Sequence, residues 1–102
     1  MRVIARKTLK DFWERPGRES AKAALQAWFQ EARKARWLRP TDVKAQYRSA
    51  DVLKEGRVVF NVGGNKYRLI AKINYSVGIV YVCFVGTHKE YDAIDAQTVR
   101  LY

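Results

Sequence analysis

The stretch THKEYD, residues 87–92, holds side chains that can transfer protons or bind an anion. It contains the only histidine of the chain, His88, and Tyr91 stands three residues later, with a lysine, a glutamate and an aspartate between and beside them. Imidazole gains and loses a proton near neutral pH, and a phenol can also take part in general acid–base catalysis. The stretch follows the apolar run GIVYVCFVG directly, so we expect it at the end of a strand.

The same stretch also has a structural interpretation. Thr87 and Glu90 have the spacing of a capping box, so Glu90 is either the partner in a helix cap or a catalytic acid. Asp92 either serves the active site or only complements the helix dipole and pairs with Lys89. His88 is either functional or a polar surface residue at a helix start, where the helix dipole disfavours the protonated imidazole and favours a phosphate.

Strand pairing predicts that two cations join the histidine. A turn centred near Val77 places Arg68 opposite Gly86 and Lys66 opposite His88, and directly opposed residues point to the same face of a sheet. These cations should therefore lie with His88 at the end of the sheet where the glycine turn GGN also lies. Such a set of groups around an anion could cleave a phosphodiester without a metal ion.

Two periodicities define the elements that must position these residues. From Gly56 onward the period is two, which predicts an antiparallel meander of RVVFNV, KYRLIAKINY and IVYVCFVG, then a short helix that begins at THKEYD. Upstream, SAKAALQAWFQEARKA has the helical period, with Ser20 as its cap, and TLKDFWER predicts a shorter helix capped by Thr8. MRVIAR is a candidate strand that could join the sheet. We expect an α+β fold in which residues 1–102 form one domain.

The segment between the long helix and the meander is irregular and basic. Pro40 and Thr41 predict a turn, and DVKAQY predicts one helical turn after it. Trp37 and Tyr47 are interleaved with basic residues, a pattern that suits contact with RNA and suits ordinary packing equally well.

Charge is the strongest signal in the composition. Twenty Lys and Arg oppose ten Asp and Glu, a formal net charge of +10, which favours nucleic acid or another polyanion as partner. One histidine and one cysteine cannot form a Cys/His metal cluster or a disulfide, so we expect neither metal nor cofactor and place Cys83 in the core. No apolar run is long enough for a membrane span and no signal peptide is visible, so we expect a cytoplasmic protein without membrane contact.

The two motifs FNVGGNKYRLIAKINY and FVGTHKEYD, in this order and spacing, resemble the HigB-type toxins of bacterial type II toxin–antitoxin modules, which belong to the RelE-like superfamily. The resemblance covers the C-terminal half well and the N-terminal helices more loosely. It implies a RelE-like α+β fold, in which N-terminal helices pack on a small twisted antiparallel sheet and a short helix follows.

The resemblance also implies a function and its site. Such a toxin is an mRNA interferase that cuts translated mRNA in the ribosomal A site, next to 16S rRNA, by metal-independent attack of the RNA 2′-hydroxyl. It implies Arg68, His88 and Tyr91 as catalytic residues, with Asn65, Lys66 and Lys89 in contact with RNA phosphates. It implies a HigA-like helix-turn-helix antitoxin, through which the complex could bind operator DNA.

Two alternative functions require only the net positive charge of the chain and no catalytic residues. The chain could be a non-catalytic basic module that binds RNA or the ribosome, or a basic domain that binds an acidic protein. The residues leave open which group is general base and which is general acid, although the base role suits a neutral His88. They also leave open the codon preference, the strict dependence on the ribosome and the stoichiometry with the antitoxin.

Overall fold

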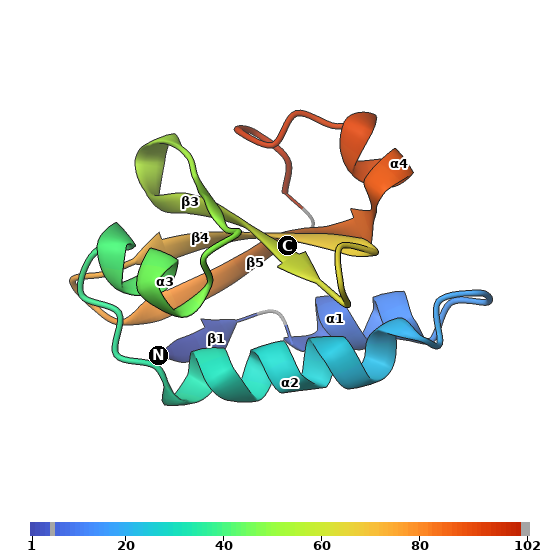
Figure 1. Cartoon of the computed structure of the whole chain (residues 1–102), viewed down its shortest axis with the longest axis horizontal. Coiled ribbons are helices and arrows are strands. Elements are labelled where there is room, and N and C mark those ends of the chain that lie inside the picture. Colours follow the sequence, from blue (N-terminus) through green and yellow to red (C-terminus); the bar gives the residue numbers. More distant parts are fainter. Residues whose placement is uncertain (5, 101–102) are drawn as a thin grey trace.

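The centre of the fold is a mixed sheet of five strands in the part of the chain that the computed structural model describes, residues 1–4 and 6–100. The strand order is β1-β5-β4-β3-β2, so the apolar strand β5 lies between two others, as its sequence predicted (Figure 1). All pairs from β2 to β5 are antiparallel, and β1 joins β5 in parallel. The strands span Arg2–Ile4 (β1), Asp51–Val52 (β2), Arg57–Val62 (β3), Tyr67–Asn74 (β4) and Ile79–Thr87 (β5).

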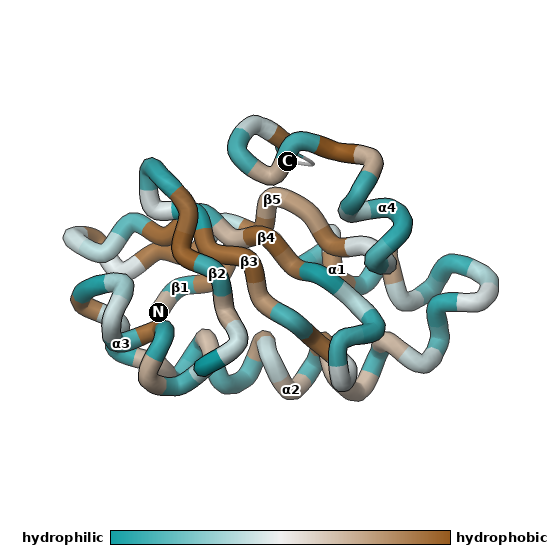
Figure 2. The backbone as a smooth tube through the Cα atoms, turned by 45° about the horizontal axis from the view of Figure 1, so that its top comes forward, coloured by the Kyte–Doolittle hydropathy of each residue, from teal (hydrophilic) through white to brown (hydrophobic). Residues whose placement is uncertain are grey.

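Two helices cover one face of this sheet, α1 at Arg6–Trp13 and α2 at Ala21–Lys34 (Figure 1). Their buried positions recur at the helical period, and together with one face of the meander they form the main core. Figure 2 shows the hydrophobic residues concentrated along β3, β4 and β5. The expected α+β fold, with N-terminal helices packed on the sheet, is confirmed.

The predicted helix caps are only partly correct. Ser20 stands at the N-cap position of α2, but its hydroxyl lies 2.6 Å from the Tyr67 hydroxyl and makes no capping bond. The prediction that Thr8 caps the first helix is wrong, because α1 begins at Arg6 and places Thr8 inside the helix. For Ser20, the tertiary contact with Tyr67 takes the place of the local capping bond.

The basic segment before the meander is packed against the core. It contains α3 (Pro40–Gln46), where Pro40 is the first helical residue, so the prediction of a turn there is wrong; proline suits this position because its fixed φ is already helical. The ring centroids of Trp37 and Tyr47 lie 6.1 Å and 5.1 Å from that of Phe60. Packing therefore accounts for these two aromatic residues.

A β-bulge sets the register at the site end of the sheet. Near their connecting turn, β4 and β5 pair Asn74 with Ile79 and Ala71 with Val82, so the turn is centred half a residue before Val77. That register would place Arg68 opposite Val85. A shift between Ile70 and Ala71 adds one residue to β5 and restores the predicted pair of Arg68 with Gly86.

The other face of the sheet is covered in part by α4 (His88–Asp92) and the residues that follow it (Figure 1). A second cluster of buried and half-buried residues joins this segment to the sheet: Val59, Ile70, Cys83, Phe84, Leu53, Tyr91, Ile94, Ala96 and Val99. Arg57 is only 3% exposed, and its Nη1 donates to the carbonyls of Ala96 and Val99 at 3.0 and 2.9 Å. The free cysteine is buried, as predicted. None of the described helices is long and apolar enough to cross a membrane.

Candidate active site

Arg68 and Tyr91 meet on the sheet face that the helices α1 and α2 leave uncovered. Arg68 lies on β4, and its guanidinium carbon is 5.8 Å from the centroid of the Tyr91 ring on α4. The contact is a cation–π arrangement. Two residues that the sequence assigned to one site, 23 positions apart in the chain, are thus neighbours.

The surroundings of Arg68 leave part of its guanidinium without a partner. Its Nη1 is buried and has no hydrogen-bond acceptor within the described residues. Directly opposite on β3 lies Asn61, whose Nδ2 donates to the Ser49 carbonyl at 3.0 Å while its Oδ1 is buried and also unpartnered. Arg68 as a whole is half-buried, and an anion that accepts from its guanidinium would satisfy the donor that the protein leaves unpaired.

Gly86, the partner of Arg68 on β5, allows α4 to approach the sheet. A Cβ at this position would lie 2.6 Å from the Phe84 ring and 3.1 Å from the Cβ of Glu90. Any larger residue would therefore push α4 away from the strand. The glycine in FVGTHK fixes the distance between the strand arginine and the residues of the helix.

The other predicted residues lie around this pair without direct bonds to it. His88 is the exposed first residue of α4, one turn before Tyr91, and Lys89 is the exposed residue after it. Lys66 and Asn65 are exposed in the turn before β4, where Asn65 has a left-handed φ of 73°. Within residues 1–4 and 6–100, no hydrogen bond or ion pair joins His88, Lys66 or Lys89 to Arg68.

Glu90 has the structural role that the sequence analysis offered as one alternative. The Thr87 hydroxyl accepts from the Glu90 amide at 3.2 Å, and the Glu90 carboxylate accepts from the Thr87 amide at 2.9 Å, which completes the capping box. Arg15, from the loop between α1 and α2, donates to the same carboxylate at 3.0 Å, and Arg18 lies 3.9 Å from it. Sequence reasoning missed both arginines, because nothing in their local pattern points to residue 90.

These contacts lower the pKa of the Glu90 carboxyl, chiefly through the Thr87 amide and then through Arg15. A carboxyl with a lowered pKa in the folded state stabilises the protein above its unfolded-state value, and this contribution is lost as the pH falls through the folded-state value. We therefore expect Glu90→Gln, which keeps the acceptor of the capping box but loses the charge, to reduce the free energy of unfolding by about 0.5 kcal/mol at pH 7, the size of an exposed ion pair. The difference should shrink as the pH falls below the ordinary pKa of 4.5 and disappear below the lowered folded-state pKa.

Urea unfolding of wild type and variant at neutral and acidic pH measures this difference. Glu14→Gln is the matched control, because Glu14 is exposed just after α1 and takes part in no ion pair of the described structure. A deficit of Glu90→Gln that keeps its size in acid would show that the charge of Glu90 contributes nothing.

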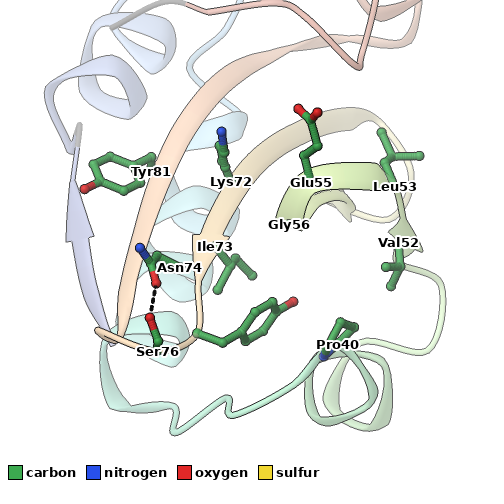
Figure 3. A pocket seen from close by; sticks show the side chains of 11 residues that line it. Pro40, Val52, Leu53, Glu55, Gly56, Lys72, Ile73, Asn74, Ser76 and Tyr81 are labelled. Carbon is green, nitrogen blue, oxygen red and sulfur yellow. Dashed lines mark hydrogen bonds between the residues drawn. The ribbon is translucent and has the colours of Figure 1, made fainter.

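A cavity of about 760 Å³ lies away from Arg68 and Tyr91, at the other end of β4, between that strand and the connection from β2 to β3 (Figure 3). Lys72, Asn74 and Tyr81 are among its lining residues, and none of the predicted site residues is. No group of three or more His, Cys, Asp or Glu side chains in the described chain is placed to hold a metal ion. The residues that the sequence predicts for proton transfer and phosphate binding lie instead near the opposite end of β4, beside α4.

Comparison with known proteins gives consistent results. Residues 21–94 match a family model described as "HigB_toxin, RelE-like toxic component of a toxin-antitoxin system". The sequence is 36% identical over 98 residues to the mRNA interferase toxin HigB of Escherichia coli K12, an alignment that covers 94% of this chain and 92% of the relative. The mRNA interferases HigB of Escherichia coli O157:H7 and Shigella flexneri match with the same identity and coverage. The matched family region runs from α2 to the residues just after α4 and includes Arg68, His88 and Tyr91.

Proposed function

Because the chain belongs to the HigB family of RelE-like toxins, we propose that it cuts mRNA with the residues gathered between β4 and the start of α4. It is an mRNA interferase, an endoribonuclease that is the toxic component of a toxin–antitoxin system, and an antitoxin is its partner. The observation that carries the proposed site is the buried, unpartnered Nη1 of Arg68 beside the Tyr91 ring.

The proposed reaction is an in-line attack by the RNA on itself. The 2′-hydroxyl of one nucleotide loses its proton and forms a bond to the adjacent phosphorus, while the bond from phosphorus to the 5′-oxygen of the next nucleotide breaks. The leaving 5′-oxygen takes up a proton. The products are an RNA end with a 2′,3′-cyclic phosphate, which can hydrolyse to a 3′-phosphate, and a 5′-hydroxyl end.

Each proposed residue has a part in this reaction. Arg68 stabilises the extra negative charge on the phosphorane, because a guanidinium stays charged and its fork of donors matches phosphate oxygens. His88, exposed at the helix start, takes the proton of the 2′-hydroxyl, and the Tyr91 phenol supplies the proton of the leaving oxygen. Asn65, Lys66 and Lys89 contact the flanking phosphates from the adjacent turn and helix.

The partners and place of action follow from this proposal. The substrate is mRNA on the ribosome, where 16S rRNA surrounds the A site and positions the strand for in-line attack. The antitoxin is a HigA-like helix-turn-helix protein, through which the complex binds operator DNA. The toxin acts in the cytoplasm as one domain over residues 1–102, and its charge of +10 supports attraction to RNA.

Expression in bacteria of the wild type and of His88→Ala tests the proposal. The wild type should arrest growth and cut cellular mRNA, and His88→Ala should do neither while remaining folded, because loss of a general base costs about 10²–10⁴-fold in rate. Glu14→Gln is the control, because Glu14 is exposed just after α1 and lies outside the proposed site. Growth arrest with mRNA cleavage by His88→Ala would contradict the role of His88.

A further inference from the structure

A groove with an apolar floor and polar walls lies between α1 and α2, on the face of the sheet opposite α4 (Figure 1). It has a volume of about 310 Å³ and is lined by Arg6, Leu9 and Trp13 from α1 and by Gln26, Phe29 and Gln30 from α2. Leu9 and Trp13 are buried and Phe29 is half-buried, so the groove has an apolar floor with room for a large side chain of a partner. The helices stand on one face of the sheet and α4 on the other (Figure 1).

The walls and rim of this groove carry charges of one sign. Along α2, Lys22, Gln26, Phe29 and Arg33 follow the spacing of a single helix face, so Lys22 and Arg33 flank the lining residues. On α1, Arg6 lines the groove, and its guanidinium carbon lies 5.4 Å from the centroid of the Phe29 ring. All three cations are exposed.

The carboxylates of these two helices do not neutralise the rim. Between Arg6 and Trp13 the only acidic residue is Asp11, which pairs with Lys7 at 3.0 Å. Between Lys22 and Arg33 it is Glu31, which accepts a hydrogen bond from the Tyr47 hydroxyl. The groove therefore combines an apolar floor with a surplus of positive charge.

We propose that the groove between α1 and α2 is a docking site for an acidic amphipathic segment of the antitoxin. A bulky apolar side chain of that segment enters between Leu9, Trp13 and Phe29, and flanking carboxylates pair with Arg6, Lys22 and Arg33. This inference rests on the proposed function, which supplies the antitoxin as partner. RNA fits the groove less well, because its phosphates could use the cations but not the apolar floor.

The position of the groove has a functional consequence. A segment held there would not cover Arg68 or Tyr91, because Tyr91 packs with the cluster on the other face of the sheet and Arg68 contacts its ring. The groove therefore provides affinity and specificity for the antitoxin, separately from any part of the antitoxin that blocks the RNA site. Charge complementarity of this kind also speeds the encounter of the two proteins, and the effect weakens as salt rises.

Affinity for the antitoxin encoded beside the toxin gene, measured by titration calorimetry with the full-length proteins, tests this inference. The double variant Lys22→Glu, Arg33→Glu should bind about tenfold more weakly, equivalent to ~1.4 kcal/mol, because two rim ion pairs become like-charge contacts. Its binding should depend less on salt than that of the wild type. Its mRNA cleavage in the absence of antitoxin should be unchanged.

The matched control is Arg48→Glu, Lys54→Glu, which changes the net charge equally at exposed positions outside both helices. If the two double variants bind the antitoxin equally weakly, only overall charge matters and the groove proposal is wrong. If the groove variant folds and binds the antitoxin normally but loses mRNA cleavage, the groove serves RNA, and the proposal is again wrong. Because affinity is measured without mRNA, a wild type that binds the antitoxin and cleaves nothing would contradict the proposed function alone.

A second variant probes the apolar floor. Phe29→Ala should weaken antitoxin binding by an amount that does not depend on salt, because it removes apolar contact area and no charge. Its urea midpoint is measured in parallel, since Phe29 also packs against the main core. A folded Phe29→Ala with the affinity of the wild type would overturn the proposal that a side chain enters the groove.

Discussion

Replacing Arg68 with alanine should slow mRNA cleavage about 10²–10³-fold, the cost of about 2.7–4 kcal/mol that follows removal of one preorganised donor to a developing anion. The stability of the protein should change little. The Nη1 of Arg68 has no hydrogen-bond partner within the described residues, and its contact with the Tyr91 ring is of the cation–π type, worth about 1 kcal/mol at a partly exposed site. Single-turnover cleavage on purified ribosomes gives the rate, and urea unfolding gives the stability.

Two further variants make this result specific. Arg68→Lys keeps the charge but loses the planar fork, so its rate should lie between those of the wild type and Arg68→Ala. Lys72→Ala removes a cation four residues farther along β4 on the same face, beside the far cavity, and should cleave at the rate of the wild type. If Arg68→Ala and Lys72→Ala reduce the rate equally, general attraction of RNA explains both, and the specific role of Arg68 is wrong.

An mRNA with a single 2′-deoxynucleotide on the 5′ side of the cut should not be cleaved there at all. The proposed nucleophile is the 2′-hydroxyl, and without it no second group in the proposed site can replace the attacking oxygen. The expected loss is complete, whereas the loss of one protein side chain leaves the contribution of ribosomal positioning in place. Primer extension across the site measures cleavage, and phosphorylation of new ends by polynucleotide kinase detects the predicted 5′-hydroxyl.

The control substrate carries the deoxynucleotide one position farther downstream. It keeps the attacking 2′-hydroxyl, so the wild type should cut the original bond normally. Cleavage of the first substrate would show that water, or a group of the protein, attacks the phosphorus. A 5′-phosphate on the downstream fragment would lead to the same conclusion. Either outcome would contradict the proposed chemistry and leave the family assignment of the chain unaffected.

The sequence alone predicted the strands and the helix that form the candidate site, because each of these elements has a recognisable pattern in its own residues. The period of two along residues 57–87 predicted three strands, and the Thr87–Glu90 spacing predicted the capping box that begins α4. Signals that tertiary packing can override were less reliable. Thr8 and Pro40 both lie inside helices whose start was predicted differently.

The pairing of Arg68 with Gly86 shows how a prediction can be correct for an incomplete reason. The turn between β4 and β5 is centred half a residue away from the predicted centre, and the bulge at Ile70 and Ala71 corrects the register. A strand period of two cannot predict a bulge, because the extra residue, Cys83, is as apolar as its neighbours.

The sequence by itself determined which residue types were available for proton transfer and phosphate binding, and the strands and helix that carry them. Only the tertiary structure decided which of them meet. It brought Tyr91 to Arg68, Asn61 to the opposite side of Arg68, and Arg15 to Glu90 across 75 positions of chain. These contacts depend on how separate elements pack on the two faces of the sheet, and no local periodicity contains that information.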